Sequence, residues 1–197
     1  MADTLDPPLR IDWLDAARTD DGLGRVGLTF LPGKHGPSTL YPGRVYRREV
    51  DADLATLADA NVTSLLLLIE DHELDRWGNP DIVERGARAG VHVERRPIPD
   101  GSPPASAEEM REILEWLAAA RRNGNVAIAC MGGVGRTGTV AACQLVRDGW
   151  TADDAIAEVR NVRHPSAVET AQQVTFVRAW EHHRGIEGSH RSGRLLP

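Results

Sequence analysis

Nine consecutive residues, Cys130 to Gly138, constrain the fold of this chain more than any other segment. Their sequence is Cys-Met-Gly-Gly-Val-Gly-Arg-Thr-Gly, in which a cysteine and an arginine enclose five small or apolar residues. The apolar stretch 126–129 precedes the cysteine and predicts a short buried strand. A helix is predicted to open on the hydroxyl of Thr137 and to continue through Val146. A strand, a glycine-rich loop and a helix in this order are typical of a backbone cradle that binds anions.

The residue types in this loop suit the chemistry of phosphate esters. Loop N–H groups and a helix N-terminus supply positive charge, which binds phosphate and favours the thiolate form of a cysteine. Cys130 is therefore a candidate nucleophile. Arg136 carries a planar guanidinium that can bind two phosphate oxygens at once. The rest of the cradle would be formed by the backbone amides of Met131, Gly132, Gly133, Val134 and Gly135.

Cys-x5-Arg-Thr is also the signature of the cysteine-dependent protein tyrosine and dual-specificity phosphatases. The chain resembles this family from about Gly27 to about Trp180, and most of all its small kinase-associated dual-specificity members. The resemblance implies an α/β fold with a largely parallel central sheet of about five strands flanked by helices. It also implies a phosphoric monoester hydrolase that acts through a phosphocysteine intermediate. Three further segments carry the resemblance in the same order: Gly27-Leu28 with Leu31-Pro32-Gly33, Pro97 to Gly101, and Ala167 to Thr170.

The resemblance gives roles to three more residues. Asp100, in the proline- and glycine-rich segment 97–104, would be the general acid, on a loop that closes over the substrate. A surface Asp-Gly turn is the alternative for this segment. Thr137 would bond to the sulfur of the nucleophile, cap the helix, or do both. Gln173 would orient the attacking water; the alternatives are an exposed helical glutamine, or Gln172 in this role.

One position departs from the family pattern. The family usually has histidine before the nucleophile, and this chain has Ala129. Because that histidine helps to hold the loop and to keep the thiol ionised, the sequence leaves the reactivity of Cys130 open. For Lys34 and His35 we favour a solvated loop over a place at the mouth of the site. Cys143 is expected to be a small core residue rather than a redox partner of the nucleophile.

Length and composition exclude several other classes of protein. The 197 residues predict one domain, and two cysteines do not make a disulfide framework. A net charge of −6 argues against a general nucleic-acid binder, and no apolar run is long enough to span a membrane. Without a signal sequence, the expected location is cytoplasmic. Because histidines and cysteines do not cluster at metal spacing, we expect no metal and no cofactor.

The alternation of apolar strands and amphipathic helices predicts one α/β domain at 25–184, which the resemblance implies is a phosphatase domain. An N-terminal lead, 1–24, would dock through Trp13 and Leu14, and a tail at 185–197 would be disordered. The predicted strands are 26–30, 45–46, 62–69, 91–95 and 126–129. The predicted helices are 51–60, 71–76, 81–89, 106–122, 137–146, 151–160 and 168–184.

Other classes of protein have similar loops. A nucleotide-binding P-loop needs glycine at position 130 and lysine at position 136, and this chain has neither. Rhodanese-like sulfurtransferases use a loop cysteine but call for neither Asp100 nor the Arg-Thr ending. Low-molecular-weight phosphatases and arsenate reductases have the loop near the N-terminus, with the acid downstream. A phosphopeptide-binding pseudophosphatase would lack one of the three key residues, and all three are present.

The substrate is left open by the sequence. We expect a phosphorylated protein or a small phosphomonoester, and neither a nucleic acid nor a membrane as partner. The loop has no lysine between Cys130 and Arg136, so phosphoproteins rank above polyphosphorylated inositides, whose extra phosphates would need extra cations. Small phosphorylated metabolites stay open as substrates. Preference between phosphotyrosine and phosphoserine or phosphothreonine, and the oligomeric state, are not assigned.

Overall fold

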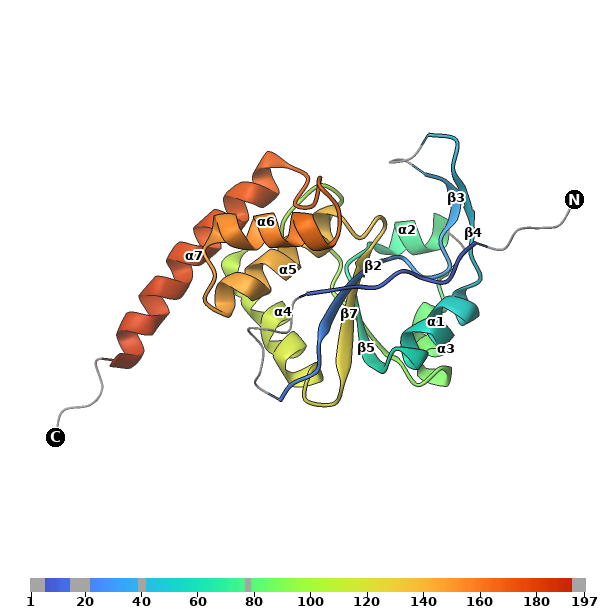
Figure 1. Ribbon diagram of the computed structural model, residues 1–197, viewed down its shortest axis with the longest axis horizontal. Coiled ribbons are helices and arrows are strands. Elements are labelled where there is room, and N and C mark those ends of the chain that lie inside the picture. Colours follow the sequence, from blue (N-terminus) through green and yellow to red (C-terminus); the bar gives the residue numbers. More distant parts are fainter. Residues whose placement is uncertain (1–5, 15–21, 39–41, 77–78, 193–197) are drawn as a thin grey trace, which may run out of the picture.

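The computed structural model describes residues 6–14, 22–38, 42–76 and 79–192. A five-stranded sheet with the order β1-β2-β7-β5-β6 forms the centre of the molecule (Figure 1). Neighbouring strands from β2 to β6 are parallel, whereas β1 lies antiparallel to β2 at one edge. The prediction of a largely parallel sheet of about five strands is confirmed. Its strands are β1 (Asp12–Trp13), β2 (Val26–Phe30), β5 (Val62–Leu67), β6 (His92–Arg95) and β7 (Asn125–Cys130).

Continuous apolar runs form the central strands because helices cover the sheet on both sides. Leu65, Leu66 and Leu67 of β5 are fully buried, as is Ile128 of β7. A strand buried on only one face would alternate apolar and polar residues, whereas a parallel strand between two helical layers is apolar throughout. The helical crossovers between the strands provide those two layers.

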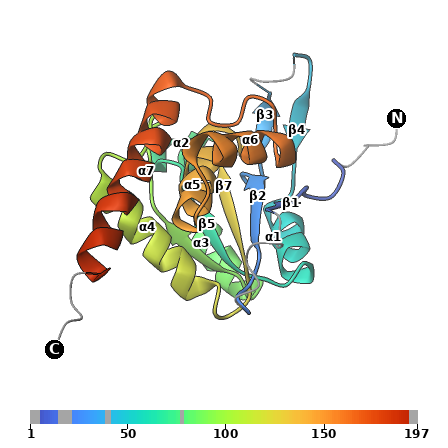
Figure 2. The same cartoon turned by 60° about the vertical axis from the view of Figure 1, so that its left-hand side comes forward.

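Figures 1 and 2 show helices on both sides of the sheet. On one side α1 packs on β5, and α3 packs on β6 and α1. On the other side α4 and α5 pack on the sheet, and α6 and α7 pack on α5. The short helix α2 (Asp71–Arg76) follows β5. The longer helices are α1 (Val50–Asp59), α3 (Ile82–Arg88), α4 (Ala107–Ala120), α5 (Gly135–Arg147), α6 (Ala152–Val162) and α7 (Ala171–Ser192).

Two helix starts follow from their capping residues as the sequence predicts. The Ser106 Oγ atom accepts a hydrogen bond of 3.1 Å from the Glu109 amide at the start of α4. The Thr151 Oγ1 atom accepts a bond of 3.1 Å from the Asp154 amide at the start of α6. Each cap satisfies one of the amides that a helix leaves without an internal partner in its first turn.

Two other helix boundaries differ from the prediction. We call the segment from Cys130 to Arg136 the phosphate loop. Helix α5 begins at Gly135, two residues before Thr137, because the end of this loop already has helical geometry. Its N-cap is Val134, which provides no side-chain cap, so Thr137 is not the capping residue. Helix α7 begins at Ala171 instead of 168, because Val168 has a φ of +59°, which no right-handed helix contains.

The C-terminal helix is also longer than expected. It continues through Ser192, where the sequence analysis predicts a disordered tail from residue 185. Once a helix is nucleated by a packed segment, each added residue gains its own backbone hydrogen bond, so a helix can extend without further packing. Residues 193–197, the rest of the predicted tail, lie outside the described residues.

Part of the predicted N-terminal lead belongs to the sheet. Asp12 and Trp13 pair with β2, and the Leu14 amide donates to the Val26 carbonyl at 3.0 Å. Leu9 and Leu14 are both buried. The domain therefore begins before residue 25. The sequence did not predict this strand, because two residues are too few to show a periodic pattern. Residues 1–5 and 15–21 of the lead lie outside the described residues.

A small hairpin stands apart from the central sheet (Figure 1). It consists of β3 (His35–Pro37) and β4 (Val45–Arg47), which pair with each other in antiparallel fashion. The sequence predicts β4 but not β3, whose glycine and proline are poor strand formers. Within this hairpin Tyr46 is buried, and its ring lies 5.9 Å from that of Phe30 at the end of β2. The hairpin therefore packs against the end of the sheet that bears the phosphate loop.

Candidate active site

The candidate residues meet at one edge of the sheet. Cys130 is the last residue of β7, and Asp100 lies on the loop after β6. Glu73, on α2, follows β5, and Lys34 follows β2. Because β2, β7, β5 and β6 are parallel, their carboxyl ends share this edge, which is where open α/β sheets bind ligands.

The phosphate loop has the backbone of an anion cradle. In the part of the chain that the structure describes, the amides of residues 131–134 donate no hydrogen bond. Buried amides without partners are rare in proteins, and consecutive ones form a nest for an anion. Gly133 has a φ of +68°, and a Cβ atom here would lie 2.2 Å from the Thr29 carbonyl oxygen. The loop can therefore take this shape only with glycine at that position.

Arg163 holds the phosphate loop from outside. Its Nε atom donates to the Gly133 carbonyl at 2.9 Å, and Nη2 donates to the Gly132 carbonyl at 3.2 Å. Its Nη1 atom pairs with Asp12 Oδ2 at 2.6 Å. In a chain with Ala129 in place of the family's histidine, these bonds anchor the loop. The sequence analysis did not identify Arg163 or Asp12, and neither lies in a recognisable motif.

Arg136 is almost completely buried and is held by a carboxylate. Its Nη1 atom lies 2.6 Å from Glu73 Oε2, and its Nη2 atom lies 2.8 Å from Glu73 Oε1. Nη1 also donates to the Ile98 carbonyl at 3.0 Å. Nε has no partner among the described residues. The Nε edge of the guanidinium is therefore left for a ligand, while the opposite end is fixed.

The pair with Glu73 shifts the pKa of both groups. Burial alone would raise the pKa of the Glu73 carboxyl, but the hydrogen bonds from Arg136 hold it below its ordinary value. Burial would lower the pKa of the guanidinium, but Glu73 and the charge of Cys130 raise it. The sequence analysis missed Glu73, because a glutamate on a short helix carries no motif.

Asp100 reaches the site from an exposed turn. Its Oδ1 atom lies 3.0 Å from Arg136 Nη2, although 81% of its side chain is accessible to solvent. Gly101 has a φ of +72°, so the segment is both an Asp-Gly turn and part of the site. Thr170 Oγ1 donates to the Gly101 carbonyl at 2.9 Å, and Gln173 Nε2 donates to the Ser102 carbonyl at 3.2 Å. These bonds tie the Asp100 loop to the start of α7.

The remaining candidates, Gln173 and Thr137, are both buried. Gln173 lies beside the phosphate loop, because a Cβ atom added to Gly135 would lie 3.2 Å from Gln173 Nε2. Gln172 is exposed, whereas Gln173 is the one of the two that is buried next to the phosphate loop. The Thr137 Oγ1 atom has no hydrogen-bond partner among the described residues. A buried hydroxyl without a partner is unusual and is typical of a functional position.

Near these residues, Glu169 is a second acid that the sequence analysis did not single out as a site residue. A Cβ atom added to Gly135 would lie 2.3 Å from Glu169 Oε2. Desolvation in this position raises the pKa of the Glu169 carboxyl, and the negative charge of Asp100 raises it further.

Lys34 corrects one expectation. We favoured a solvated loop for it, but it is only 5% exposed, and its Nζ atom lies 4.4 Å from the centre of the Tyr46 ring. The hairpin buries the side chain by placing Tyr46 against it. His35 is exposed, and its Nδ1 atom lies 3.0 Å from the Gly33 carbonyl. Cys143 is fully buried in α5, and burial raises the pKa of its thiol, which favours a core residue.

The described residues contain neither a metal-binding cluster nor a membrane-spanning helix. No three or more histidine, cysteine, aspartate or glutamate residues among them are grouped so that they could hold a metal ion. No helix in this part of the chain is both long and apolar enough to cross a membrane.

Comparisons with known proteins agree with this geometry. A family model described as "Polymorphic toxin system, DSP-PTPase phosphatase" matches residues 43–150. Cyclin-dependent kinase inhibitor 3 of Rattus norvegicus is 29% identical over 179 residues, which are 89% of this chain and 80% of the relative. Its counterpart in Homo sapiens is 28% identical over 173 residues, which are 86% of this chain and 77% of the relative.

Solved structures of phosphatases have the same fold. Kinase associated phosphatase, with its catalytic cysteine replaced by serine, superposes with a TM-score of 0.78 at 25% identity. That match covers 91% of this chain and 98% of the other. The active form of Tk-PTP superposes with a TM-score of 0.67 at 30% identity, over 87% of this chain and 96% of the other.

Proposed function

This chain belongs to the DSP-PTPase family of phosphatases, and we propose that it hydrolyses phosphate monoesters through a covalent phosphocysteine on Cys130. One observation carries the proposal. Cys130 is followed by four residues, 131–134, whose amides donate no hydrogen bond to a described residue, and by Arg136, whose buried Nε atom has no partner among the described residues. A nucleophile and a set of N–H donors that converge on one position for an anion are what phosphoryl transfer requires.

The first step transfers the phosphoryl group to sulfur. The Cys130 thiolate attacks phosphorus, the S–P bond forms, and the bond from phosphorus to the alcohol oxygen breaks. Asp100 gives its proton to that oxygen, so the leaving group departs as a neutral alcohol. Loop amides and the Nε edge of Arg136 bind the equatorial oxygens, whose charge is spread over all three in the transition state.

The second step returns the free enzyme. A water molecule attacks phosphorus, Asp100 takes a proton from it, and the S–P bond breaks to release inorganic phosphate and the thiolate. We assign the orientation of this water to Gln173, which is buried between the phosphate loop and the Asp100 loop. Thr137, whose buried hydroxyl has no partner in the described chain, would donate to sulfur and stabilise the departing thiolate.

The substrate that we propose is a phosphorylated protein or a small phosphomonoester. An 81% exposed side chain at Asp100 gives an open site, which admits a phosphorylated side chain at the surface of a partner. We place the reaction in the cytoplasm, because a catalytic thiolate requires a reducing compartment. The similarity to the two kinase-associated relatives does not assign their protein partner to this chain.

Hydrolysis of 4-nitrophenyl phosphate tests this function. Freshly reduced protein should release nitrophenol without added metal and in the presence of a chelator, and Cys130→Ser should be inactive. The Cys143→Ser variant is the matched control, because its thiol is buried in the core on α5, the helix that follows the phosphate loop. Absence of turnover in reduced wild type would contradict the function, and tight phosphopeptide binding without turnover would instead favour a binding module.

A further inference from the structure

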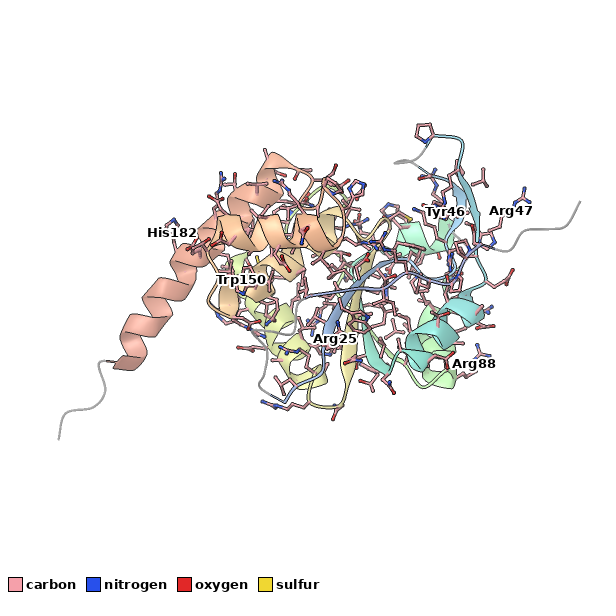
Figure 3. All side chains as sticks on the ribbon, in the orientation of Figure 1. Arg25, Tyr46, Arg47, Arg88, Trp150 and His182 are labelled. Carbon is pink, nitrogen blue, oxygen red and sulfur yellow. The ribbon has the colours of Figure 1, made fainter. Side chains whose placement is uncertain are left out.

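A cavity of about 240 Å³ lies next to the phosphate loop. Gly132 and Val134 of the loop form one wall. The N-terminal segment at Pro7 and Pro8, the end of β2 and the hairpin that carries Tyr46 form the others. Figure 3 shows Tyr46 on this hairpin, at the same end of the molecule as the N-terminal segment. Neither Cys130 nor Arg136 lines the cavity. The cavity is therefore separate from the catalytic cradle but adjoins it through Gly132 and Val134.

The lining of this cavity is strongly basic, and no aspartate or glutamate of the described residues belongs to it. Three of the arginines in this lining form ion pairs with aspartates that do not line the cavity. The Arg48 guanidinium forms a buried pair with Asp53, with distances of 2.8 and 2.5 Å. Arg10 and Arg163 both pair with Asp12, each at 2.6 Å. Two cations of the lining, Lys34 and Arg44, have no such carboxylate among the described residues.

Lys34 is the less usual of these two residues. It is 5% exposed, and its ammonium group makes no hydrogen bond or ion pair with a described residue. The charges that act on it are those of Cys130, Arg44 and Arg163, of which two are also positive. Burial lowers the pKa of its ammonium group, which the Cys130 charge only partly opposes. A buried cation that no described carboxylate pairs with is costly, and an anion bound in the cavity would reduce that cost.

Arg44 faces the same aromatic ring as Lys34. Its Cζ atom lies 4.7 Å from the centre of the Tyr46 ring, and the Lys34 Nζ atom lies 4.4 Å from it. The ring therefore positions both cations, which leaves their N–H groups for a ligand. An ammonium and a planar guanidinium together are well suited to a phosphate dianion.

We propose that this cavity is a second anion subsite, and that the preferred substrate carries a second phosphate group, which Lys34 and Arg44 bind while the first is cleaved at Cys130. This inference rests on the proposed function of the catalytic cradle. The cavity is smaller than the roughly 300 Å³ at the lower end of ordinary small-molecule sites, so it would hold a phosphate and a few carbon atoms. Since Gly132 and Val134 line it, the two phosphates would lie close together.

With this subsite, polyphosphorylated inositides no longer rank below phosphoproteins as substrates. Because the loop has no lysine, the sequence ranks polyphosphorylated inositides below phosphoproteins, since their additional phosphates need additional cations. The structure provides cations at this place from the segment after β2 and from the start of β4, far from the loop in sequence. A second phosphate could belong to a phosphorylated polyol or to a peptide with two phosphorylated residues, and the experiment separates these sources.

Calorimetric titration of the Cys130→Ser protein measures binding without turnover. One arm compares inositol monophosphate with inositol bisphosphates, and the other compares a phosphotyrosine peptide with the same peptide carrying an adjacent phosphoserine. The second phosphate should lower the dissociation constant by about tenfold or more in at least one arm, as expected for buried charge-assisted bonds. The arm that shows the gain identifies the source of the second phosphate.

Variants of the subsite decide where the second phosphate binds. In the Cys130→Ser background, Lys34→Met removes the ammonium group that lies over the Tyr46 ring and leaves an unbranched apolar side chain. Arg44→Gln changes an exposed residue. Both should bring the ratio of the two dissociation constants close to one. The control, Arg88→Gln, removes an equal charge on α3, away from the hairpin (Figure 3), and should leave the ratio unchanged.

Two results would overturn the subsite. One is a ratio within about twofold of one in both arms, since a buried charge-assisted bond should give more. The other is a preference that survives Lys34→Met and Arg44→Gln. Failure of the proposed function is distinct from either result, because it would appear as loss of 4-nitrophenyl phosphate hydrolysis in wild type.

Discussion

Arg136 and Glu73 form a buried bidentate ion pair that joins the phosphate loop to α2, with both contacts at or below 2.8 Å. The glutamate takes one N–H of each terminal nitrogen and leaves Nε without a partner among the described residues. The guanidinium is therefore already oriented before a phosphate arrives. Pre-orientation of this kind reduces the entropy that binding and catalysis must overcome.

Glu73→Gln should weaken catalysis and stability together. The amide has one acceptor oxygen and one NH2 donor, so it cannot accept from Nη1 and Nη2 on two separate atoms. Arg136 therefore loses its orientation, and kcat/KM should fall by up to about 100-fold. Removal of one partner of a buried pair should also cost about 3 kcal/mol of unfolding free energy. Steady-state kinetics and thermal denaturation measure the two effects. Glu84→Gln, an exposed change on α3, is the control, and equal behaviour of the two variants would contradict the role of Glu73.

The same pair predicts a dependence of stability on pH. Because the folded-state pKa of Glu73 lies below the ordinary 4.5, its stabilisation is complete above about pH 4.5 and is lost as the pH falls through the lower folded value. The difference in Tm between wild type and Glu73→Gln should therefore be largest near neutral pH and should shrink in acid. A constant difference from neutral pH to well below pH 4 would show that the charge of Glu73 does not contribute.

Gly133→Ala should collapse the phosphate loop. A Cβ atom would lie 2.2 Å from a backbone oxygen that cannot move without disturbing β2, so both Tm and kcat/KM should fall sharply. Gly90→Ala is the matched control, because Gly90 has a φ of +78° but no atom within 4 Å of an added Cβ. Left-handed backbone strain should lower the free energy of unfolding of that control by only about 1–2 kcal/mol, and its activity should be unchanged. Similar losses in the two variants would mean that backbone strain alone is responsible.

Arg163→Lys should loosen the loop that Arg136 and the nucleophile share. A lysine cannot donate to Gly132, Gly133 and Asp12 at the same time in the geometry of the arginine fork. We expect kcat to fall by about tenfold or more, because a misplaced loop weakens transition-state binding. Arg178→Lys, in an exposed pair with Asp153, is the control. Wild-type kcat in Arg163→Lys would show that the loop needs no such anchor.

Asp100→Asn should slow the reaction in a way that depends on the leaving group. A general acid raises the rate by about 100- to 10,000-fold when the alcohol is a poor leaving group. Phenyl phosphate should therefore lose much more activity than 4-nitrophenyl phosphate, whose leaving group needs less protonation. An equal loss with both substrates would contradict the role of Asp100 as the acid.

The sequence predicted the central residues of the site because their signals are local. Cys130 and Arg136 lie in one loop with a distinctive spacing, and Asp100 precedes them in a loop rich in proline and glycine. The structure brings Asp100 within 3.0 Å of Arg136. The parallel sheet was equally predictable, because apolar strands alternating with amphipathic helices leave few other arrangements.

The supporting residues could not be predicted in the same way, because their contacts are between distant segments. Glu73 is separated from Arg136 by 63 residues, and Asp12 from Arg163 by 151. Partners this far apart in the chain form no motif or periodic pattern that could be recognised in the sequence. The sequence favoured a solvated loop for Lys34, whereas the hairpin brings Tyr46 against its ammonium group and buries it. Such contacts depend on the fold as a whole and not on any segment of it.

Helix ends show the same limit on a smaller scale. Capping residues placed the starts of α4 and α6 correctly, because the cap bonds to an amide three residues away. The start of α7 depends on the left-handed backbone of Val168, which apolar periodicity does not reveal. Its end at Ser192 lies eight residues beyond the predicted end at 184, because propagation of a helix requires no apolar pattern.

The central claim is that Cys130 carries the phosphoryl group, and trapping the intermediate tests it most directly. Rapid acid quench of the Gln173→Ala variant with 4-nitrophenyl phosphate should capture it, because the second step is slowed more than the first. Peptide mass spectrometry should then find one phosphoryl group on the peptide that contains Cys130, and none on the peptide from Cys130→Ser. A protein that turns over this substrate fully while Cys130 stays unmodified, or that remains active as Cys130→Ser, would contradict the account.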